Sequence, residues 1–280
     1  MTSSSKLAVV VCHGCYHSTE PYMPLLDALK AEGIDAYCPQ LPTSDLTKLN
    51  VGDAQNPNFD LGPPAEGYPQ GEQDAEVVLD ILKSLVEEQG KTVVLLGSAG
   101  GWTATQAAKK ELQAKERAEQ GLAGGIIGIL YVGAFIIPVG ESVHSFFQPK
   151  DGTAVVPPFM KFHKHGAEGL GTIVKPETFL FNDLDSDAAK KWAGALTASP
   201  ILTTKLTNAD VYPHLPCGYL VLDGDLTLPK EYQEGMIAAQ VADTSVPFTV
   251  YHCSAGHSPH LSWKKGVVEV VQKFARSVFA

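Results

Sequence analysis

Runs of Val, Ile and Leu alternate along the chain with stretches whose apolar residues recur every three or four positions. Helical spacing is clearest in residues 22–29, 77–85 and 267–274. Short, continuous apolar strands that alternate with helices are typical of a parallel sheet covered by helices on both faces. The runs predict six strands, at residues 7–12, 34–38, 93–96, 126–132, 219–222 and 248–251.

Two segments interrupt this alternation. Residues 43–70 are rich in Pro, Gly, Asn and Asp and have no sustained period, which predicts a long loop. Residues 138–216 contain weaker helical stretches such as 185–196, and we interpret them as a helical cap inserted between the fourth and fifth strands. The expected division is therefore an α/β core of residues 1–137 and 217–280 and a cap of residues 138–216.

The amino-acid composition indicates which binding partners and which cellular compartment suit this protein. The chain has 280 residues and is 44% hydrophobic and 19% charged, an ordinary globular mixture, but its net charge is −10. An acidic protein is a poor match for nucleic acid or an anionic membrane, so a small-molecule partner is favoured, and a homodimer remains compatible. The five scattered cysteines and the lack of a membrane-length apolar run predict a cytoplasmic protein.

The candidate chemistry lies at the ends of the predicted strands. Open parallel sheets bind ligands at the carboxyl ends of their strands. Ser98 follows the third run, Asp225 the fifth and His257 the sixth. A serine hydroxyl becomes nucleophilic when an imidazole takes its proton, and the imidazole needs a carboxylate on its other nitrogen. The chain therefore supplies a candidate Ser-His-Asp triad.

Four motifs carry a resemblance to a known superfamily: VVVCHGCYH, LLGSAGGW, YLVLDGDLTLP and SAGHSPHLS. In this order they resemble the α/β-hydrolase superfamily, most of all its small capped members related to plant methylesterases and hydroxynitrile lyases, which include many fungal esterases and lactonases. The resemblance covers nearly the whole chain. It implies a hydrolase without a cofactor or metal, and an oxyanion hole made by the backbone N–H groups of Cys15 and Ala99.

The nucleophile elbow can be aligned in two frames. With Ser98 as nucleophile, the downstream Ser-x-Gly-Gly pattern is intact, but Leu96 occupies the position of the first small residue. In the frame shifted by one residue, Gly97 and Gly101 are the outer glycines and the nucleophile position holds Ala99. The first frame predicts an active serine hydrolase and the second an inactive chain; we favour Ser98.

Other residues receive subsidiary interpretations. Asp223 is the nearest rival of Asp225, and His260 competes with His257. His13 is expected to fix the oxyanion loop. The pair His163 and His165 in the cap lacks a nearby third ligand, so solvated histidines are favoured over a metal site. Side chains expected to line the substrate site are Tyr16, His17, Trp102 and Trp192, although Trp102 could instead pack beneath the cap.

Three classes of function remain open from the sequence. The first is a serine hydrolase that cleaves a carboxylic ester or lactone of a small, hydrophobic or aromatic substrate, a preference based on the many apolar and aromatic residues of the cap. The second is a carbon–carbon lyase similar to hydroxynitrile lyases. The third is a catalytically inactive ligand-binding member, which is favoured if Ala99 occupies the nucleophile position.

Overall fold

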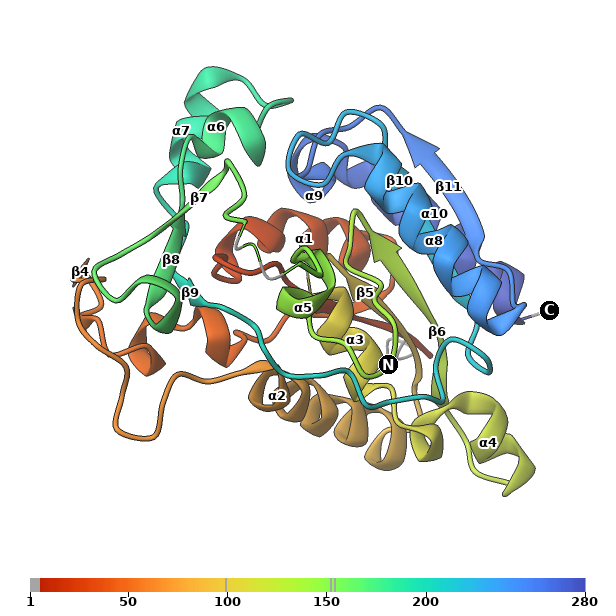
Figure 1. Ribbon diagram of the computed structural model, residues 1–280. Coiled ribbons are helices and arrows are strands. Elements are labelled where there is room, and N and C mark those ends of the chain that lie inside the picture. The colour runs from red at the N-terminus through yellow and green to blue at the C-terminus, as the bar shows by residue number, and fades with distance from the viewer. Residues whose placement is uncertain (1–5, 99, 152, 154, 280) are drawn as a thin grey trace.

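One parallel sheet forms the centre of the molecule. The computed structural model describes residues 6–98, 100–151, 153 and 155–279 (Figure 1). The strands lie in the order β11-β10-β6-β5-β1-β2, and all neighbouring pairs are parallel. The six expected strands are all present and their ends shift by no more than two residues: β1 Leu7–Cys12, β2 Asp35–Tyr37, β5 Thr92–Gly97, β6 Gly125–Val132, β10 Cys217–Leu222 and β11 Thr249–Cys253.

Helices bury both faces of this sheet. Successive side chains of a strand point to opposite faces, so Val9 and Val11 of β1 pack on one side with α1 Met23–Ala31 and α10 Lys264–Phe279. Ala8 and Val10 pack on the other side. That second face is covered by α2 Gly71–Lys83, α3 Gly101–Ala107 and α8 Lys230–Thr244. Burial on both faces explains why the strands are continuous apolar runs in the sequence.

Short elements connect the core. A π-helical turn, Ser84–Glu88, extends α2, and α9 Pro259–Ser262 precedes α10. The remaining short helices of the core are the 3-10 turns Glu20–Tyr22, Pro42–Ser44, Leu46–Lys48 and Lys110–Leu112 and the helix α4 Ala114–Glu119. No helix in the described ranges is long and apolar enough to span a lipid bilayer.

The segment between β6 and β10, which we call the cap, is not purely helical. Its helices are α5 Val143–Phe147, α6 Pro176–Phe179 and α7 Ser186–Ala193, with a 3-10 turn at Gly166–Glu168. Three short strands, β7 Met160–Phe162, β8 Leu170–Ile173 and β9 Ser199–Pro200, pair into an antiparallel sheet that the sequence analysis did not predict. Strands of two to four residues are too short to leave a period-two pattern in the sequence. The helix expected at 185–196 is α7.

The long loop packs against the cap. Most of residues 43–70 is irregular, as expected, but two-residue strands, β3 Gly52–Asp53 and β4 Asn56–Pro57, form a small hairpin within it. Leu49 and Val51 of the loop are buried together with Leu170 and Ala198 of the cap. The loop and the cap therefore share a small hydrophobic cluster separate from the two main cores.

We predict that Leu49→Ala destabilises the protein by about 3 kcal/mol, because Leu49 is fully buried in this shared cluster. Leu226→Ala is the matched control, since its side chain is half exposed and its loss should change stability by less than about 0.5 kcal/mol. Chemical denaturation measures both. Equal stability of the two variants would contradict a packed junction between loop and cap.

Candidate active site

The turn after β10 contains two aspartates, Asp223 and Asp225, which have different surroundings. Asp225 is buried, and its Oδ1 accepts hydrogen bonds from the N–H groups of Thr227 (2.8 Å) and Leu228 (2.9 Å). Its Oδ2 lies 2.8 Å from Nδ1 of His257. Asp223 lies at the surface instead and bonds to His252 and Lys230. The structure therefore brings Asp225, and not its rival, to the histidine.

The loop after β11 presents His257 to this carboxylate. Burial lowers the pKa of His257, but the charge and hydrogen bond of Asp225 and the charge of Asp183 raise it by more, so the net pKa lies above that of an ordinary histidine. Because Nδ1 donates its proton to Asp225, Nε2 is the basic nitrogen of the neutral ring. Among the described residues, Nε2 makes no hydrogen bond. It is therefore free to accept a proton from a bound molecule.

Three glycines define the turn from β5 into α3. A Cβ on Gly97 would lie 2.8 Å from the Cα of Gly101, and one on Gly101 would lie 2.6 Å from the carbonyl oxygen of Phe135. Gly100 approaches the end of β1 as closely, since its Cβ would lie 2.6 Å from the carbonyl oxygen of His13. Such distances exclude any side chain at these positions. Gly97 and Gly101 are thus in backbone contact across the turn.

Ser98 is held inside this turn by its backbone. Its N–H donates to the Cys12 carbonyl (3.2 Å), and its own carbonyl accepts from the N–H of Gly101 (2.9 Å). Burial raises the pKa of Tyr22, and a hydrogen bond with the Ser98 hydroxyl partly offsets that rise. In the described part of the chain, no hydrogen bond joins Ser98 to His257. Ala99, the other candidate for the nucleophile position and the expected second oxyanion donor, lies outside the described residues.

Residues 13–17 follow β1, and we call them the oxyanion loop because the sequence analysis expects an oxyanion donor at Cys15. His13 is fully buried: its Nε2 accepts the N–H of Leu41 (2.9 Å) and its Nδ1 lies 2.9 Å from the Gly14 carbonyl, while burial lowers its pKa to about 4. His13 thus joins the oxyanion loop to residue 41, in line with the structural role expected for it. Burial raises the pKa of the Cys15 thiol to about 12, so this thiol is protonated at neutral pH. Any contribution of Cys15 to catalysis then comes from its backbone N–H.

Tyr22 is a residue of the site that the sequence analysis missed. Its hydroxyl accepts the N–H of Gly14 at 2.9 Å and also contacts Ser98. Its ring stacks on His260 at a centroid distance of 4.2 Å and an angle of 5°. In the sequence, Tyr22 was only the first apolar position of a helical stripe. A buried tyrosine needs a hydrogen-bond partner for its hydroxyl, and this need was the one sequence signal that Tyr22 makes a polar contact in the site.

Two of the expected lining residues lie between the core and the cap. Tyr16 has a left-handed backbone (φ 65°), its N–H donates to Ser44, and its carbonyl accepts the N–H of Thr197 from the cap. His17 packs edge-on against Phe181 of the cap, and burial lowers the pKa of His17 to about 3. Both residues therefore join the oxyanion loop to the cap.

The other two expected lining residues have different surroundings. Trp102 is buried under α2, where a Cβ on Gly71 would lie 2.5 Å from its ring. Trp102 thus packs in the main core against α2, whereas the alternative expected from the sequence was packing beneath the cap. Trp192 belongs to a small core of the cap with Leu180 and Phe181, and Lys191 lies over its ring at 4.3 Å. Neither tryptophan has a described contact with His257 or Asp225.

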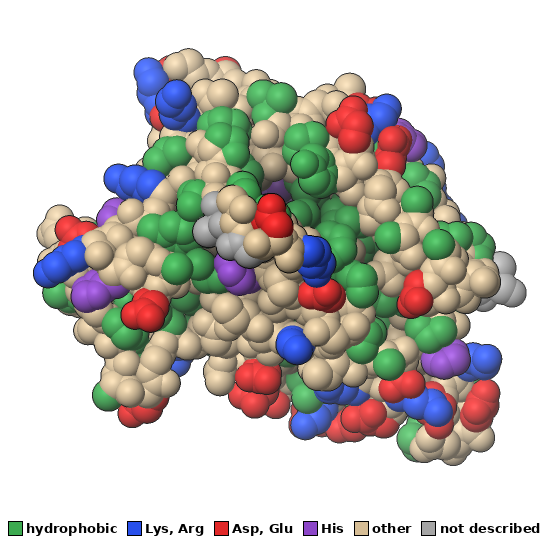
Figure 2. All heavy atoms as spheres, viewed as in Figure 1, with side chains coloured by type: hydrophobic (Ala, Val, Ile, Leu, Met, Phe, Trp, Pro, Cys, Tyr) green, Lys and Arg blue, Asp and Glu red, His purple; other side chains and the backbone are tan. Residues whose placement is uncertain are grey.

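Hydrophobic side chains gather on the face shared by the cap and the core. Figure 2 shows them between α6 and α8. Phe147 packs against Phe135 after β6 and against Phe146 of its own helix, at centroid distances of 5.1 and 5.0 Å. A separate hollow of about 380 Å³ lies between the long loop and the cap, where Tyr68 and Glu168 line it. That hollow is lined neither by Asp225 nor by His257.

Of the two cap histidines singled out in the sequence, His163 bonds to protein groups and His165 is exposed. His163 Nε2 lies 2.9 Å from the Thr172 hydroxyl, and its Nδ1 lies 3.8 Å from Asp60 of the long loop. His165 packs against Gly62 of the same loop. Within the described residues, no three His, Cys, Asp or Glu side chains are grouped closely enough to hold a metal ion.

A parallel sheet with a tight strand-to-helix turn, a buried His-Asp pair and an inserted cap defines the class of α/β hydrolases. Residues 9–270 match the profile of the Alpha/beta hydrolase family, and the chain belongs to that family.

Several relatives extend over the whole length. "Alpha/beta hydrolase nvfD" of Aspergillus novofumigatus (strain IBT 16806) is 24% identical over 272 residues, which are 96% of this chain and 97% of nvfD. The crystal structure of a pyrethroid hydrolase from Sphingobium faniae JZ-2 matches with a TM-score of 0.70 at 17% identity, covering 96% and 97% of the two chains. Methylesterase MES16 from Arabidopsis matches with a TM-score of 0.62 at 15% identity, covering 96% and 99%.

We predict that Asp225→Asn lowers the pKa of His257. The change removes the charge that raises this pKa most, and the desolvation that lowers it remains. A titration of the histidine ring signals by NMR measures the shift, with the His257 signal identified by its absence in His257→Gln. Asp223→Asn is the control, because Asp223 bonds to His252 at the surface. This variant should leave the pKa of His257 unchanged.

Proposed function

We propose that this protein hydrolyses a carboxylic ester or lactone and that His257, supported by Asp225, is the general base. The observation that carries the proposal is the buried 2.8 Å contact between Nδ1 of His257 and Oδ2 of Asp225, which leaves Nε2 free. Membership of the α/β hydrolases and the likeness to proteins named as a pyrethroid hydrolase and a methylesterase support the substrate class. The phenylalanines Phe135, Phe146 and Phe147 favour a hydrophobic substrate.

The frame of the elbow decides which group attacks the carbonyl carbon. Gly97 and Gly101 are in backbone contact, which is the relation expected of the two outer glycines in Gly-x-Ser-x-Gly. The residue midway between them is Ala99, not Ser98. The left-handed backbone typical of a strained elbow is also not found at Ser98. These observations favour the frame in which the nucleophile position holds alanine.

That frame has no serine nucleophile, and for this reason the sequence alone predicted an inactive chain; we propose that a water molecule activated by His257 attacks in place of the serine hydroxyl. Nε2 of His257 removes a proton from water, the resulting hydroxide adds to the ester carbonyl, and the tetrahedral intermediate expels the alcohol, which takes its proton from His257. The backbone N–H of Cys15 and the N–H of Gly100, the residue after the centre of the turn, stabilise the oxyanion. Gly100 packs against the end of β1, next to the oxyanion loop. No acyl-enzyme forms on this route.

The alternative route runs through Ser98. Ser98 is the one hydroxyl-bearing residue among positions 97–101, so an acyl-enzyme in this chain would have to form on it. The route needs the Ser98 hydroxyl to leave Tyr22 and reach Nε2 of His257 when substrate binds. Catalytic hydrogen bonds often tighten only in the substrate complex, so this route deserves a direct test.

We predict that Ala99→Ser makes the protein react with a fluorophosphonate, a reagent that modifies only activated serines. The unmodified chain and Ser98→Ala should remain unlabelled, and the double change Ser98→Ala with Ala99→Ser should label as well as Ala99→Ser alone. Intact-protein mass spectrometry reads out the adduct. Labelling of the unmodified chain that disappears in Ser98→Ala would instead assign the nucleophile to Ser98.

We also predict that the turnover of p-nitrophenyl acetate rises with pH through one ionisation above that of an ordinary histidine. His257 accepts a proton only when neutral, and its pKa is raised, so activity is lost as pH falls through this pKa. His257→Gln should lower kcat by about 10²- to 10⁴-fold, the usual contribution of a general base. A protein that folds, binds small esters and never hydrolyses them would be a ligand-binding member of the family.

A further inference from the structure

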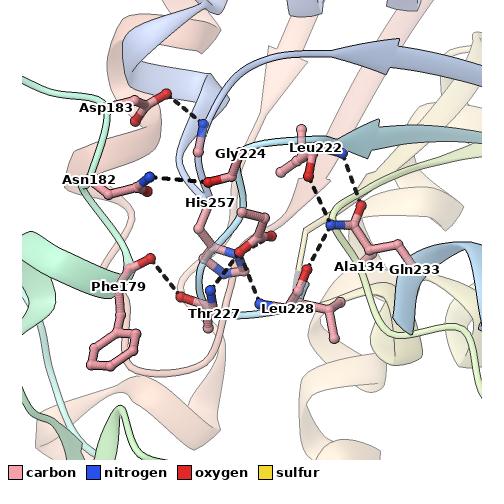
Figure 3. A network of polar contacts seen from close by, with 12 residues as sticks. Ala134, Phe179, Asn182, Asp183, Leu222, Gly224, Thr227, Leu228, Gln233 and His257 are labelled. Atoms are coloured by element: carbon pink, nitrogen blue, oxygen red, sulfur yellow. Dashed lines mark hydrogen bonds and ion pairs between the residues drawn. The ribbon is translucent and has the colours of Figure 1, made fainter. Parts of the chain in front are cut away.

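One short segment of the cap contacts both loops that carry the proposed base and its acid. Asn182 and Asp183 lie between α6 and α7 (Figure 3). The side-chain amide of Asn182 donates to the carbonyl of Gly224 at 3.1 Å, and Oδ2 of Asp183 accepts the N–H of Gly256 at 2.7 Å. Gly224 directly precedes Asp225, and Gly256 directly precedes His257. Two neighbouring residues of the cap therefore hold the backbone next to the acid and next to the base.

Further bonds reinforce this connection. The Thr227 hydroxyl donates to the carbonyl of Phe179 in the cap (2.7 Å), while the Thr227 N–H donates to Asp225 (2.8 Å). Oδ2 of Asp183 also accepts the hydroxyl of Ser262 in α9 (2.6 Å). A Cβ on Gly256 would lie 2.3 Å from Oδ1 of Asn182, so the close fit requires glycine. The cap thus reaches the acid turn by two hydrogen bonds and the histidine loop by one.

We propose that Asn182 and Asp183 form a clamp that positions His257 and Asp225 for proton transfer, so that the seating of the cap sets the geometry of the base. The inference rests on the proposed function, because the pair it positions is the proposed general base and its partner. It assigns positioning roles to both clamp residues, neither of which contacts the reacting atoms.

The clamp also contributes charge. Four titratable groups interact electrostatically with His257: Asp225 in the acid turn, Asp183 in the cap, His17 in the oxyanion loop and His260 in α9. Burial lowers the pKa of His17 and His260, so both are neutral, and the two carboxylates supply the charge around the base. The charge of Asp183 adds to that of Asp225 in raising the pKa of His257. If Asp183 only held Gly256 in place by a hydrogen bond, a neutral side chain that accepts the same bond would serve equally well.

The effect of the Asp183 charge on His257 can be tested without any substrate. Asp183→Asn keeps the size and the accepting oxygen of the side chain and removes the charge. We expect NMR titration of the histidine rings to give a lower pKa for His257 in this variant. Asp185→Asn is the matched control: Asp185 also lies in the cap and accepts two backbone N–H groups, but it is not among the groups that shift His257. An unchanged His257 titration in Asp183→Asn would overturn the charge role of the clamp.

The positioning is tested by kinetics with p-nitrophenyl acetate. Asn182→Ala removes the bond to Gly224 without changing any charge. It should lower kcat by about tenfold, the value of one hydrogen bond of ~1.4 kcal/mol, with KM and the His257 titration unchanged. Asp183→Asn should move the acid limb of the pH profile to lower pH. If the Asn182→Ala variant has the same kcat as the unmodified protein, Asn182 does not position the base.

The same experiments separate the clamp from the proposed function. If no variant and no unmodified protein hydrolyses the ester, the proposed function fails, while the NMR titrations still decide whether Asp183 acts on His257. If the unmodified protein is active and both clamp variants match it in kcat and titration, the clamp fails alone. Circular dichroism confirms folding, and Ser262→Ala, which removes one bond to Asp183 but keeps its charge, should leave the His257 titration unchanged.

Discussion

A buried carboxylate needs hydrogen-bond or charge partners, and the partners of Asp225 come from several parts of the molecule. Each oxygen has partners: the backbone of Thr227 and Leu228 binds one, and His257 binds the other. Removing one member of such a buried pair typically costs 3–5 kcal/mol, because the remaining charge is left uncompensated. The turn after β10, the loop after β11 and the cap segment that contacts both therefore have to be fixed together.

A second constraint acts at the turn from β5 into α3. The contact between Gly97 and Gly101 brings the start of α3 against the sheet, and the contact of Gly100 with β1 brings it against the oxyanion loop. These contacts are independent of which residue carries a hydroxyl. The described part of the turn therefore keeps these close backbone approaches, whereas the sequence has alanine midway between the two glycines.

The sequence predicted the sheet well because of how the sheet is buried. Strands covered on both faces are continuous apolar runs, so 7–12 and 126–132 match β1 and β6 almost residue by residue. Asp225 and His257 were chosen as candidates because each follows such a run, and the structure places their side chains 2.8 Å apart. The small sheet of the cap was missed because β9 has only two residues and β8 only four, which is too short for a period.

The polar contacts that organise the site were harder to foresee. Tyr22 bonds to Gly14, eight residues away, and Asp183 bonds to Gly256, 73 residues away. A tyrosine in an apolar stripe and an aspartate before a helix have ordinary local explanations, a buried ring and a helix start. Only the fold brings them to the oxyanion and histidine loops. For the same reason the choice between Ser98 and Ala99 depended on backbone contacts of glycine, which no pattern of side chains records.

Burial gives the histidines around the site different roles. His13, His17 and His260 are all buried, no carboxylate among the described residues pairs with them, and burial lowers the pKa of each. They therefore remain neutral where proteins are usually active, and they add no positive charge that would oppose protonation of His257. His257 alone among the four has Asp225 against its ring, and its pKa moves in the opposite direction. Of these four buried histidines, one has a raised pKa and three have a lowered pKa, a difference that suits the role of general base proposed for His257.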